Sequence, residues 1–147
     1  MPELELRPAT AADKSFLREL ANDPAAIAAS SYTTRISEEE HAAWFSRKLA
    51  DPDCRISIAI FQNKPAGALR LEREEDAWRV SISVLKDFRG LNIASAMLAQ
   101  GCCDPVLYKA TVRNHNEPSL KLFAGAGFAA IARDEEKTVF ALDNRPV

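Results

Sequence analysis

The sequence has few cysteines, no long apolar run and no excess of basic residues, and each shortage excludes a class of protein. Three of the 147 residues are cysteine, Cys54, Cys102 and Cys103. An odd set with two adjacent thiols suits neither an ordinary structural disulfide nor a zinc site, so we expect reduced thiols. No apolar stretch approaches the length of a membrane span, and residues 1–12 lack the pattern of a secretory signal. We therefore expect a cytoplasmic protein with no membrane partner.

The charge is nearly balanced, with a formal net charge of −2 and no long basic block. A general nucleic-acid-binding surface needs clustered Lys and Arg, so no nucleic-acid partner is expected. At 147 residues the chain fits a single domain, 1–147, that can bury a core without metals or disulfides. The two histidines, His41 and His115, form no metal-binding motif.

Hydrophobic periodicity predicts alternating strands and helices. Leu4 and Leu6 alternate with charged residues as in a half-buried strand, and Ser37 before Glu38–Glu40 is typical of a helix start. An Ala-rich segment near 24–30 is expected to form a second short helix, followed by a loop over 31–35. The other predicted elements are a helix over Ala11–Ala21, a hairpin of Arg55–Phe61 and Ala66–Leu71 turning at Asn63-Lys64-Pro65, a strand over Trp78–Val84, a helix over Ile93–Cys103, a strand over Leu107–Val112, a short helix from Glu117 to near Gly125, and a hairpin of Phe128–Ala132 and Thr138–Leu142. This order predicts an α/β (α+β) three-layer domain with a mixed, mostly antiparallel sheet.

The segment Arg89-Gly90-Leu91-Asn92-Ile93-Ala94 lies between a predicted strand and a predicted helix. A tight turn there leaves backbone N–H groups unpaired at the positive end of the helix dipole, and Arg89 adds a fixed charge. This arrangement favours an anion such as a phosphate. The alternative is a simple turn that carries a solvated Arg.

A second segment, Asn116-x-x-Ser119-x-x-Leu122-Phe123-x-x-x-Gly127-Phe128, follows the strand expected over Leu107–Val112. Together the two segments resemble the GCN5-related N-acetyltransferases (GNAT), whose loop reads R/Q-x-x-G-x-G/A and binds the pyrophosphate of acetyl-CoA. The resemblance implies acetyl-CoA as co-substrate, with the two central strands splayed apart around its pantetheine arm and helices flanking the sheet. Asn92 replaces the middle glycine of the family's loop, and Asn is the non-glycine residue most tolerant of positive φ. The coenzyme-binding residues implied are Val84, Leu85, Arg89, Gly90, Leu91, Asn92, Ile93, Ala94, Ser95, Asn116, Ser119 and Phe123.

Acetyl transfer to an amine needs a bound donor, a neutral amine, an oxyanion donor and a proton for the leaving thiolate. The backbone N–H of Leu85 is the expected oxyanion donor. Many relatives carry a Tyr acid where this chain has Phe123, which cannot donate a proton, and Ser119 is a weak substitute whose commoner role is to cap the helix. Glu72 is the candidate base, and a solvated acidic hairpin is the alternative. Asn116 is expected either to contact the coenzyme or to cap the helix.

The acceptor side is suggested by Glu40-His41-x-x-Trp44-Phe45 and Gly67-x-x-Arg70-x-Glu72. These segments resemble the branch that acetylates the 4-amino group of a UDP-linked amino sugar in the pseudaminic-acid pathway. His41, Trp44 and Arg70 are then the expected acceptor-binding residues, since guanidinium and aromatic groups suit phosphates and rings; structural packing is the alternative for His41 and Trp44. A protein N-terminus, a polyamine or an antibiotic amine is also a compatible acceptor. A non-catalytic acyl-CoA-binding regulatory module remains open, and a homodimer through a sheet edge would fit the fold.

Overall fold

A mixed seven-stranded sheet is the centre of the part of the chain that the structure, a computed structural model, describes: residues 3–23 and 37–147. The strand order is β1-β2-β3-β4-β5-β7-β6, and β4 and β5 are the parallel pair among otherwise antiparallel neighbours. The predicted mixed, mostly antiparallel sheet is confirmed. The strands are β1 (Leu4–Pro8), β2 (Cys54–Phe61), β3 (Lys64–Glu74), β4 (Ala77–Val84), β5 (Leu107–Arg113), β6 (Ala129–Arg133) and β7 (Lys137–Asp143).

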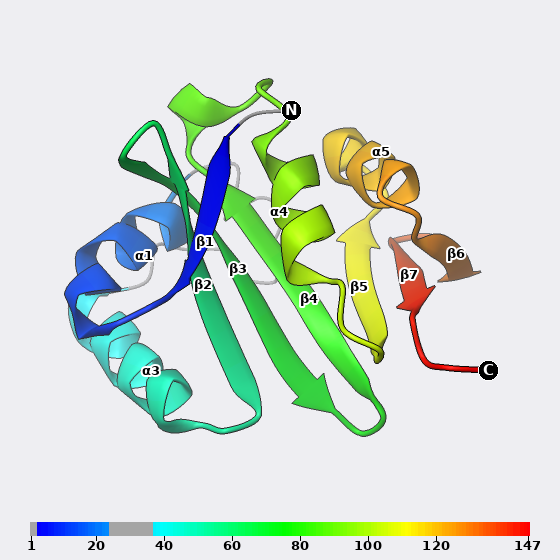
Figure 1. Cartoon of the computed structure of the whole chain (residues 1–147), viewed down its shortest axis with the longest axis horizontal. Helices are drawn as coiled ribbons and strands as arrows, with labels where there is room; N and C mark the ends of the chain where they lie inside the picture. The colour runs from blue at the N-terminus through cyan, green and yellow to red at the C-terminus, as the bar shows by residue number, and fades with distance from the viewer. Residues whose placement is uncertain (1–2, 24–36) are drawn as a thin grey trace.

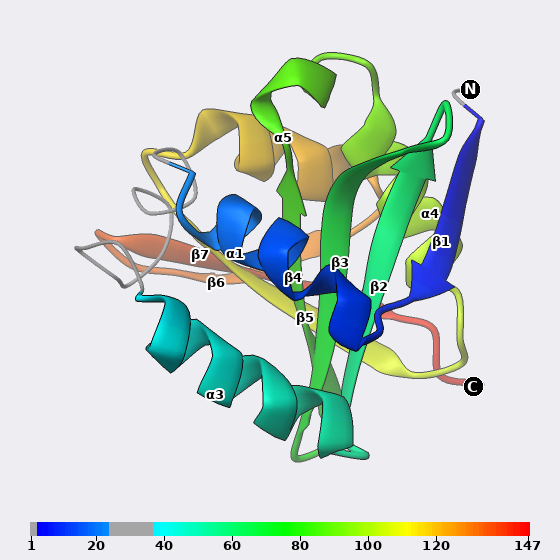
Figure 2. The ribbon, with the colours of Figure 1, turned by 90° about the vertical axis from the view of Figure 1, so that its left-hand side faces the viewer.

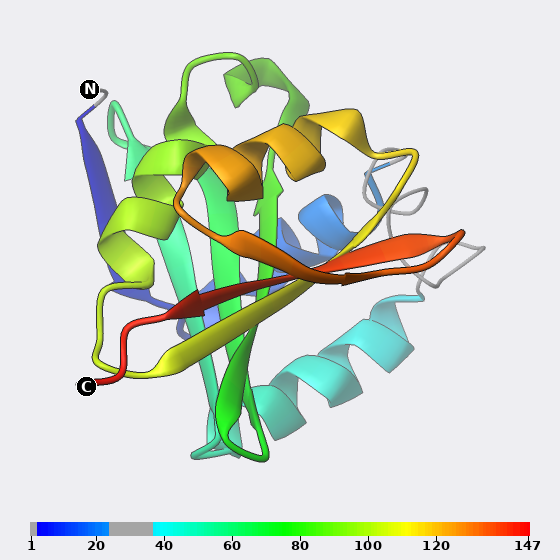
Figure 3. The same cartoon turned by 90° about the vertical axis from the view of Figure 1, so that its right-hand side faces the viewer.

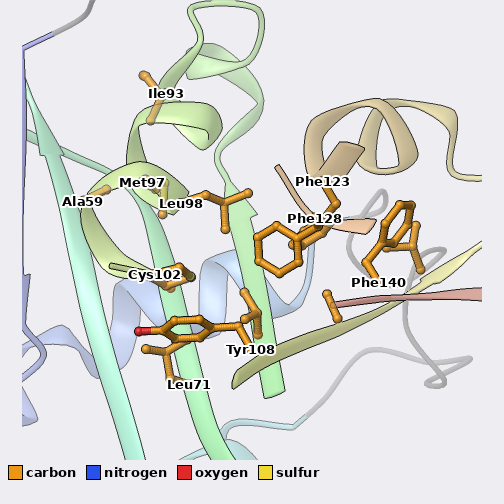
Figure 4. Close-up of a cluster of buried hydrophobic side chains, with 14 of the residues drawn as sticks. Ala59, Leu71, Ile93, Met97, Leu98, Cys102, Tyr108, Phe123, Phe128 and Phe140 are labelled. Carbon is orange, nitrogen blue, oxygen red and sulfur yellow. The ribbon is translucent and has the colours of Figure 1, made fainter. Parts of the chain in front are cut away.

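Helices cover both faces of this sheet, which gives the three layers that were predicted (Figures 1, 2 and 3). Helices α1 and α3 lie on one face, and α4 and α5 lie on the other. A smaller core under α1 and α3 includes Leu17, Phe45 and Ile58. The larger core lies under α4 and α5 and contains the side chains drawn in Figure 4. The helices are α1 (Lys14–Ala21), α3 (Glu38–Ala50), α4 (Ile93–Gly101) and α5 (Glu117–Gly125), with 3-10 turns η1 (Ala11–Asp13) and η2 (Lys86–Phe88).

Strands β4 and β5 pair over a short stretch only and then diverge. Their parallel register runs from Ala77 opposite Leu107 to Arg79 opposite Lys109. Beyond Arg79, β4 stays paired with β3 as far as Val84, while β5 stays paired with β7 as far as Arg113. The expected splaying of the two central strands is therefore confirmed, and beyond Arg79 one backbone edge of β4 has no neighbouring strand among the described residues.

Local signals placed the helix starts correctly. Thr10 and Asp13 form a capping box at η1, and Ser37 accepts a hydrogen bond from the Glu40 N–H at the start of α3. The first predicted helix is divided into η1 and α1. The second predicted short helix, near 24–30, lies outside the described residues.

The turn between β2 and β3 differs from the prediction. Gln62 and Asn63 both have positive φ, 51° and 64°, which is the type I′ geometry that matches the twist of a two-residue hairpin. The turn therefore ends at Asn63, and Lys64 and Pro65 already belong to β3. This strand also continues past the predicted end at Leu71 to Glu74, so Glu72 lies inside the sheet.

The cysteines are free thiols, as expected. Burial raises the pKa of the Cys102 thiol to about 12, which keeps it protonated and unreactive at neutral pH. No helix in the described ranges has the length and apolar character needed to cross a bilayer.

Candidate functional site

The loop between η2 and α4 has the geometry of an anion site. Gly90 and Asn92 both adopt left-handed backbone conformations, with φ of 81° and 61°. Asn92 is the N-cap residue of α4, and Gly90, Leu91 and Asn92 are exposed. Within the described residues, no oxygen accepts a hydrogen bond from the backbone N–H groups of residues 90–95. These N–H groups lie at the positive end of the α4 dipole, as an anion-binding loop requires.

The side chain of Arg89 faces away from this loop. Its Nη2 lies 2.9 Å from Asp23 Oδ1 at the end of α1, and its Nε donates to the Val84 carbonyl at 3.1 Å. The carboxylate neutralises much of the charge that the sequence assigned to anion binding. Backbone N–H groups, rather than Arg89, are therefore the principal donors that the loop presents.

The backbone edge of β4 corrects one predicted role. The Leu85 N–H donates to the Ala66 carbonyl at 2.8 Å, so it is occupied by the β3–β4 ladder and does not face the diverging strands. The direction of the backbone hydrogen-bonding groups alternates from residue to residue along an antiparallel strand. The preceding residue, Val84, therefore directs its N–H and carbonyl toward the β5 side. The Leu85 N–H is therefore not available for the oxyanion role predicted for it, and the N–H that this edge presents is that of Val84.

Three predicted coenzyme-binding residues, Asn116, Ser119 and Phe123, lie at the start of α5 or within it. Asn116 caps the helix by accepting a hydrogen bond from the Ser119 N–H at 3.3 Å, so the cap is Asn116 rather than Ser119. Ser119 is half-buried in the first turn. Phe123 is 3% exposed and packs edge-on against Phe128 and stacked on Phe140, with ring centroids 5.1 and 5.9 Å away (Figure 4). Its ring is part of the larger core.

Glu72 lies on the α1/α3 face, where three cations surround its carboxylate. Lys48 Nζ is 2.5 Å from Oε2, while Arg70 Nε and Arg79 Nη2 are 2.8 and 3.0 Å from Oε1. Burial raises the pKa of Glu72, but the Lys48 hydrogen bond and the charges of Arg70 and Arg79 outweigh it and hold this pKa below its ordinary value. A carboxylate this firmly ion-paired is a poor proton acceptor, and it is not the solvated hairpin residue of the alternative interpretation either. The ion pairs therefore argue against the base role, and the burial of Glu72 within β3 excludes the solvated hairpin.

The predicted acceptor-binding residues Trp44 and Arg70 lie together. The Arg70 guanidinium lies over the Trp44 ring, 5.0 Å from its centroid, and Arg70 Nη2 is 3.5 Å from the Ser81 hydroxyl. Lys48 and Arg79 complete this group, although neither was singled out from the sequence. The sequence contained a signal for Arg79, because the period-2 alternation of the strands places Arg79 and Ser81 on the same face as Arg70 and Glu72.

His41 is separate from this group and is 2% exposed in α3, beside Trp44 and Phe45. It lines a pocket of about 300 Å³ between α1 and α3, together with Lys14, Ser15, Arg18, Glu19, Asn22 and Glu38. Burial, and then the charges of Arg18 and Lys14, lower the pKa of His41, so its ring is neutral at pH 7. His115 is exposed, and the described residues contain no cluster of three potential metal ligands.

Comparison with known proteins agrees with this fold. Residues 3–129 match the acetyltransferase (GNAT) domain family. No match to a curated protein was found. Among solved structures, the chain is similar to a spermidine N-acetyltransferase from Vibrio cholerae in complex with CoA and spermine (TM-score 0.81, 15% identity, 95% of this chain and 94% of that chain covered). It is also similar to a candidate phosphinothricin N-acetyltransferase (TM-score 0.82, 23% identity, 98% and 100% covered) and to a candidate acetyltransferase from Salmonella typhimurium with its cofactor acetyl-CoA (TM-score 0.80, 16% identity, 99% and 96% covered).

The chain therefore belongs to the GNAT acetyltransferase domain family, a class of acetyl-CoA-dependent acyltransferases. Because the family match spans most of the sequence, it includes the diverging strands, the loop before α4 and α5.

Proposed function

We propose that this protein transfers the acetyl group of acetyl-CoA to a primary amine of a small molecule. The observation that carries the proposal is the row of N–H groups at residues 90–95, which have no partner in the part of the chain that the structure describes and which begin α4 beside the diverging strands. The coenzyme diphosphate binds these N–H groups, and the pantetheine arm runs along the open edge of β4 at Val84. The presence of CoA and acetyl-CoA in the solved structures of similar fold supports the choice of coenzyme.

The reaction proceeds by direct attack. The neutral amine nitrogen bonds to the thioester carbonyl carbon, the C–S bond breaks, and the sulfur leaves as a thiolate that takes a proton from the product ammonium or from water. The Val84 N–H lies on the strand edge where the carbonyl oxygen develops charge, and it stabilises that oxygen as an oxyanion. Phe123 contributes no proton, since its ring carries no hydroxyl.

A UDP-linked amino sugar is the leading candidate for the acceptor. The contact between Trp44 and Arg70 supports it, because an aromatic ring and a guanidinium side by side suit a sugar or base joined to a phosphate. A protein N-terminus, a polyamine and an antibiotic amine are the other acceptors to compare. We also propose that the protein acts in the cytoplasm.

Two measurements test whether the protein binds acetyl-CoA and transfers its acetyl group. Isothermal titration with acetyl-CoA measures binding, and release of free thiol in the presence of UDP-amino sugars, peptides or polyamines measures transfer. Binding without thiol release from any acceptor would favour a regulatory acyl-CoA-binding module. The Gly90→Glu variant should stay folded and lose acetyl-CoA binding, because a carboxylate in the loop repels the diphosphate.

Gly125→Glu is the matched control for this variant. It adds the same charge at another glycine with open space around the new side chain, at the end of α5. We expect it to bind acetyl-CoA as the unmodified protein does. Unchanged affinity in Gly90→Glu would rule out the proposed diphosphate site.

A further inference from the structure

The ion-paired group on β3, β4 and α3 has the features of a second binding subsite. We infer that Arg70 binds an anionic group of the acceptor, a carboxylate or a phosphoryl group, and that Glu72 is the positioning residue that holds Arg70 in place. This inference rests on the proposed acetyl transfer and names the class of acceptor: a primary amine that also carries a negative charge.

Arg70 is held on three sides. Its Nε faces Glu72 Oε1, its Nη2 reaches the Ser81 hydroxyl, and one face of its guanidinium lies over Trp44. Its side chain is still 32% exposed. Among the described residues no acceptor binds Nη1, which leaves a fixed donor for a ligand. A guanidinium fixed in this way recognises a carboxylate or phosphoryl oxygen at a lower entropic cost than a mobile surface Arg.

Glu72 supplies the rigidity. Its carboxylate connects Arg70 on the same strand with Lys48 on α3 and Arg79 on β4, so one buried acid fixes cations from three elements. An exposed ion pair orders its partners poorly, but the Glu72 side chain is only 11% exposed and has limited access to water. Arg70 Nε makes an ion pair with this carboxylate but no hydrogen bond, so loss of the carboxylate would remove the charge that holds the Arg70 side chain in place.

The position of Arg70 suits an acceptor. Arg79 is the last β4 residue paired with β5, and Ser81 follows where the two strands have separated. Arg70 is the β3 partner of Ser81, one strand spacing away, or about 4.8 Å. An amine placed beside the open β4 edge can therefore extend its anionic group onto Arg70 across the α1/α3 face.

The charge balance selects against polycations. Lys48, Arg70 and Arg79 outnumber Glu72 and Glu74, the carboxylates with which they pair, so the group keeps one net positive charge. A polyamine would bring further positive charge to this face, while an acidic amine would compensate it.

Paired acceptors test the inference. Each pair carries the same amine with and without the anion: a UDP-linked amino sugar against the free amino sugar, and glutamate against its diamide. In one of the two pairs we expect a higher kcat/KM for the anionic acceptor than for the neutral one. A preference in the UDP pair would identify the bound anion as a phosphoryl group, and a preference in the glutamate pair would identify it as a carboxylate. Arg70→Gln should reduce that preference by about 10- to 100-fold, the range expected for a lost hydrogen bond to a charged group.

Glu72→Gln separates positioning from proton transfer. A positioning role predicts a higher KM for the anionic acceptor, nearly unchanged kcat and an unchanged pH profile. A general base predicts a collapse of kcat and loss of the acidic limb of the profile. Glu135→Gln is the control, since it removes an exposed carboxylate in the turn between β6 and β7, outside this group, and it should leave both constants unchanged.

The outcomes are distinguishable from failure of the proposed function. If acetyl-CoA does not bind, the donor proposal fails. If acetyl-CoA binds and anionic and neutral acceptors react equally well, or Arg70→Gln keeps the preference, the subsite inference is overturned. Titration of UDP and glutamate into the CoA-saturated protein gives a direct readout, and failure of both to bind, or equal binding by Arg70→Gln, also overturns it. If Glu72→Gln fails to fold, the Arg70→Gln results decide.

Discussion

Replacing Gly90 by alanine isolates the cost of the left-handed backbone in the donor loop. Gly90 has φ +81°, and no atom lies within 4 Å of the position that a Cβ would take. A new methyl group therefore meets no steric clash, and its whole cost comes from the backbone conformation, about 1–2 kcal/mol for an L-residue in this region. Gly125, at the end of α5, has the same open space without a left-handed φ. There, alanine should raise the free energy of unfolding by about 0.4–1 kcal/mol.

Urea denaturation of both variants, analysed at equal m-value, measures this contrast. We expect Gly90→Ala and Gly125→Ala to differ by roughly 2 kcal/mol in the free energy of unfolding, with opposite signs relative to the unmodified protein. Acetyl-CoA affinity should be unchanged in Gly125→Ala. Equal stability of the two variants would show that Gly90 is not held in the left-handed conformation, and the N–H arrangement of the loop would then lose its structural basis.

Three further predictions concern Asn92, Asp13 and Phe123. Asn92→Gly keeps the left-handed turn and removes the side chain, so calorimetry should show tighter acetyl-CoA binding; weaker binding would mean that the amide group contacts the coenzyme. Hydrogen bonds from Arg7 hold the pKa of Asp13 below its ordinary 3.8. The ionised Asp13 carboxylate therefore contributes fully to the free energy of unfolding above pH 3.8, and this contribution is lost as the pH falls through the lowered pKa. The stability difference between the unmodified protein and Asp13→Asn in urea titrations should therefore shrink in acid, and a constant difference would contradict this. Phe123→Tyr puts a hydroxyl into an apolar core and should lower the free energy of unfolding by about 1–3 kcal/mol without raising kcat; a rise in kcat would place position 123 at the thiol.

The sequence predicted the features that depend on local chemistry. The cap at Ser37 and the left-handed tolerance of Asn92 are properties of single residues and their near neighbours. The divergence of β4 from β5 followed from the family resemblance, and the full strand order was not predicted, because periodicity alone does not specify which strands pair.

The wrong assignments depended on partners that are distant in the sequence. The direction of the Leu85 N–H is set by its register with Ala66, and a shift of one residue would exchange the roles of Leu85 and Val84. The ion pairs of Glu72 involve Lys48, which is 24 residues away. Arg89 reaches Asp23 across 66 residues, so its charge could not be known to be neutralised from the loop sequence alone.

These corrections have a common consequence for how the site works. Glu72 is bound by three cations and the Leu85 N–H belongs to the sheet, so two of the three groups first expected to handle protons or the oxyanion, with Ser119 the third, are engaged in structure. For the proposed transfer there remain a loop of N–H groups for the donor, a strand edge at Val84 for the thioester and the guanidinium of Arg70 for the acceptor. A thioester is already an activated acyl donor, and holding it against a neutral amine removes the entropic part of the barrier, which can reach about 7–11 kcal/mol in well-oriented systems. The residues of this chain therefore favour catalysis by orientation over catalysis by a dedicated acid and base.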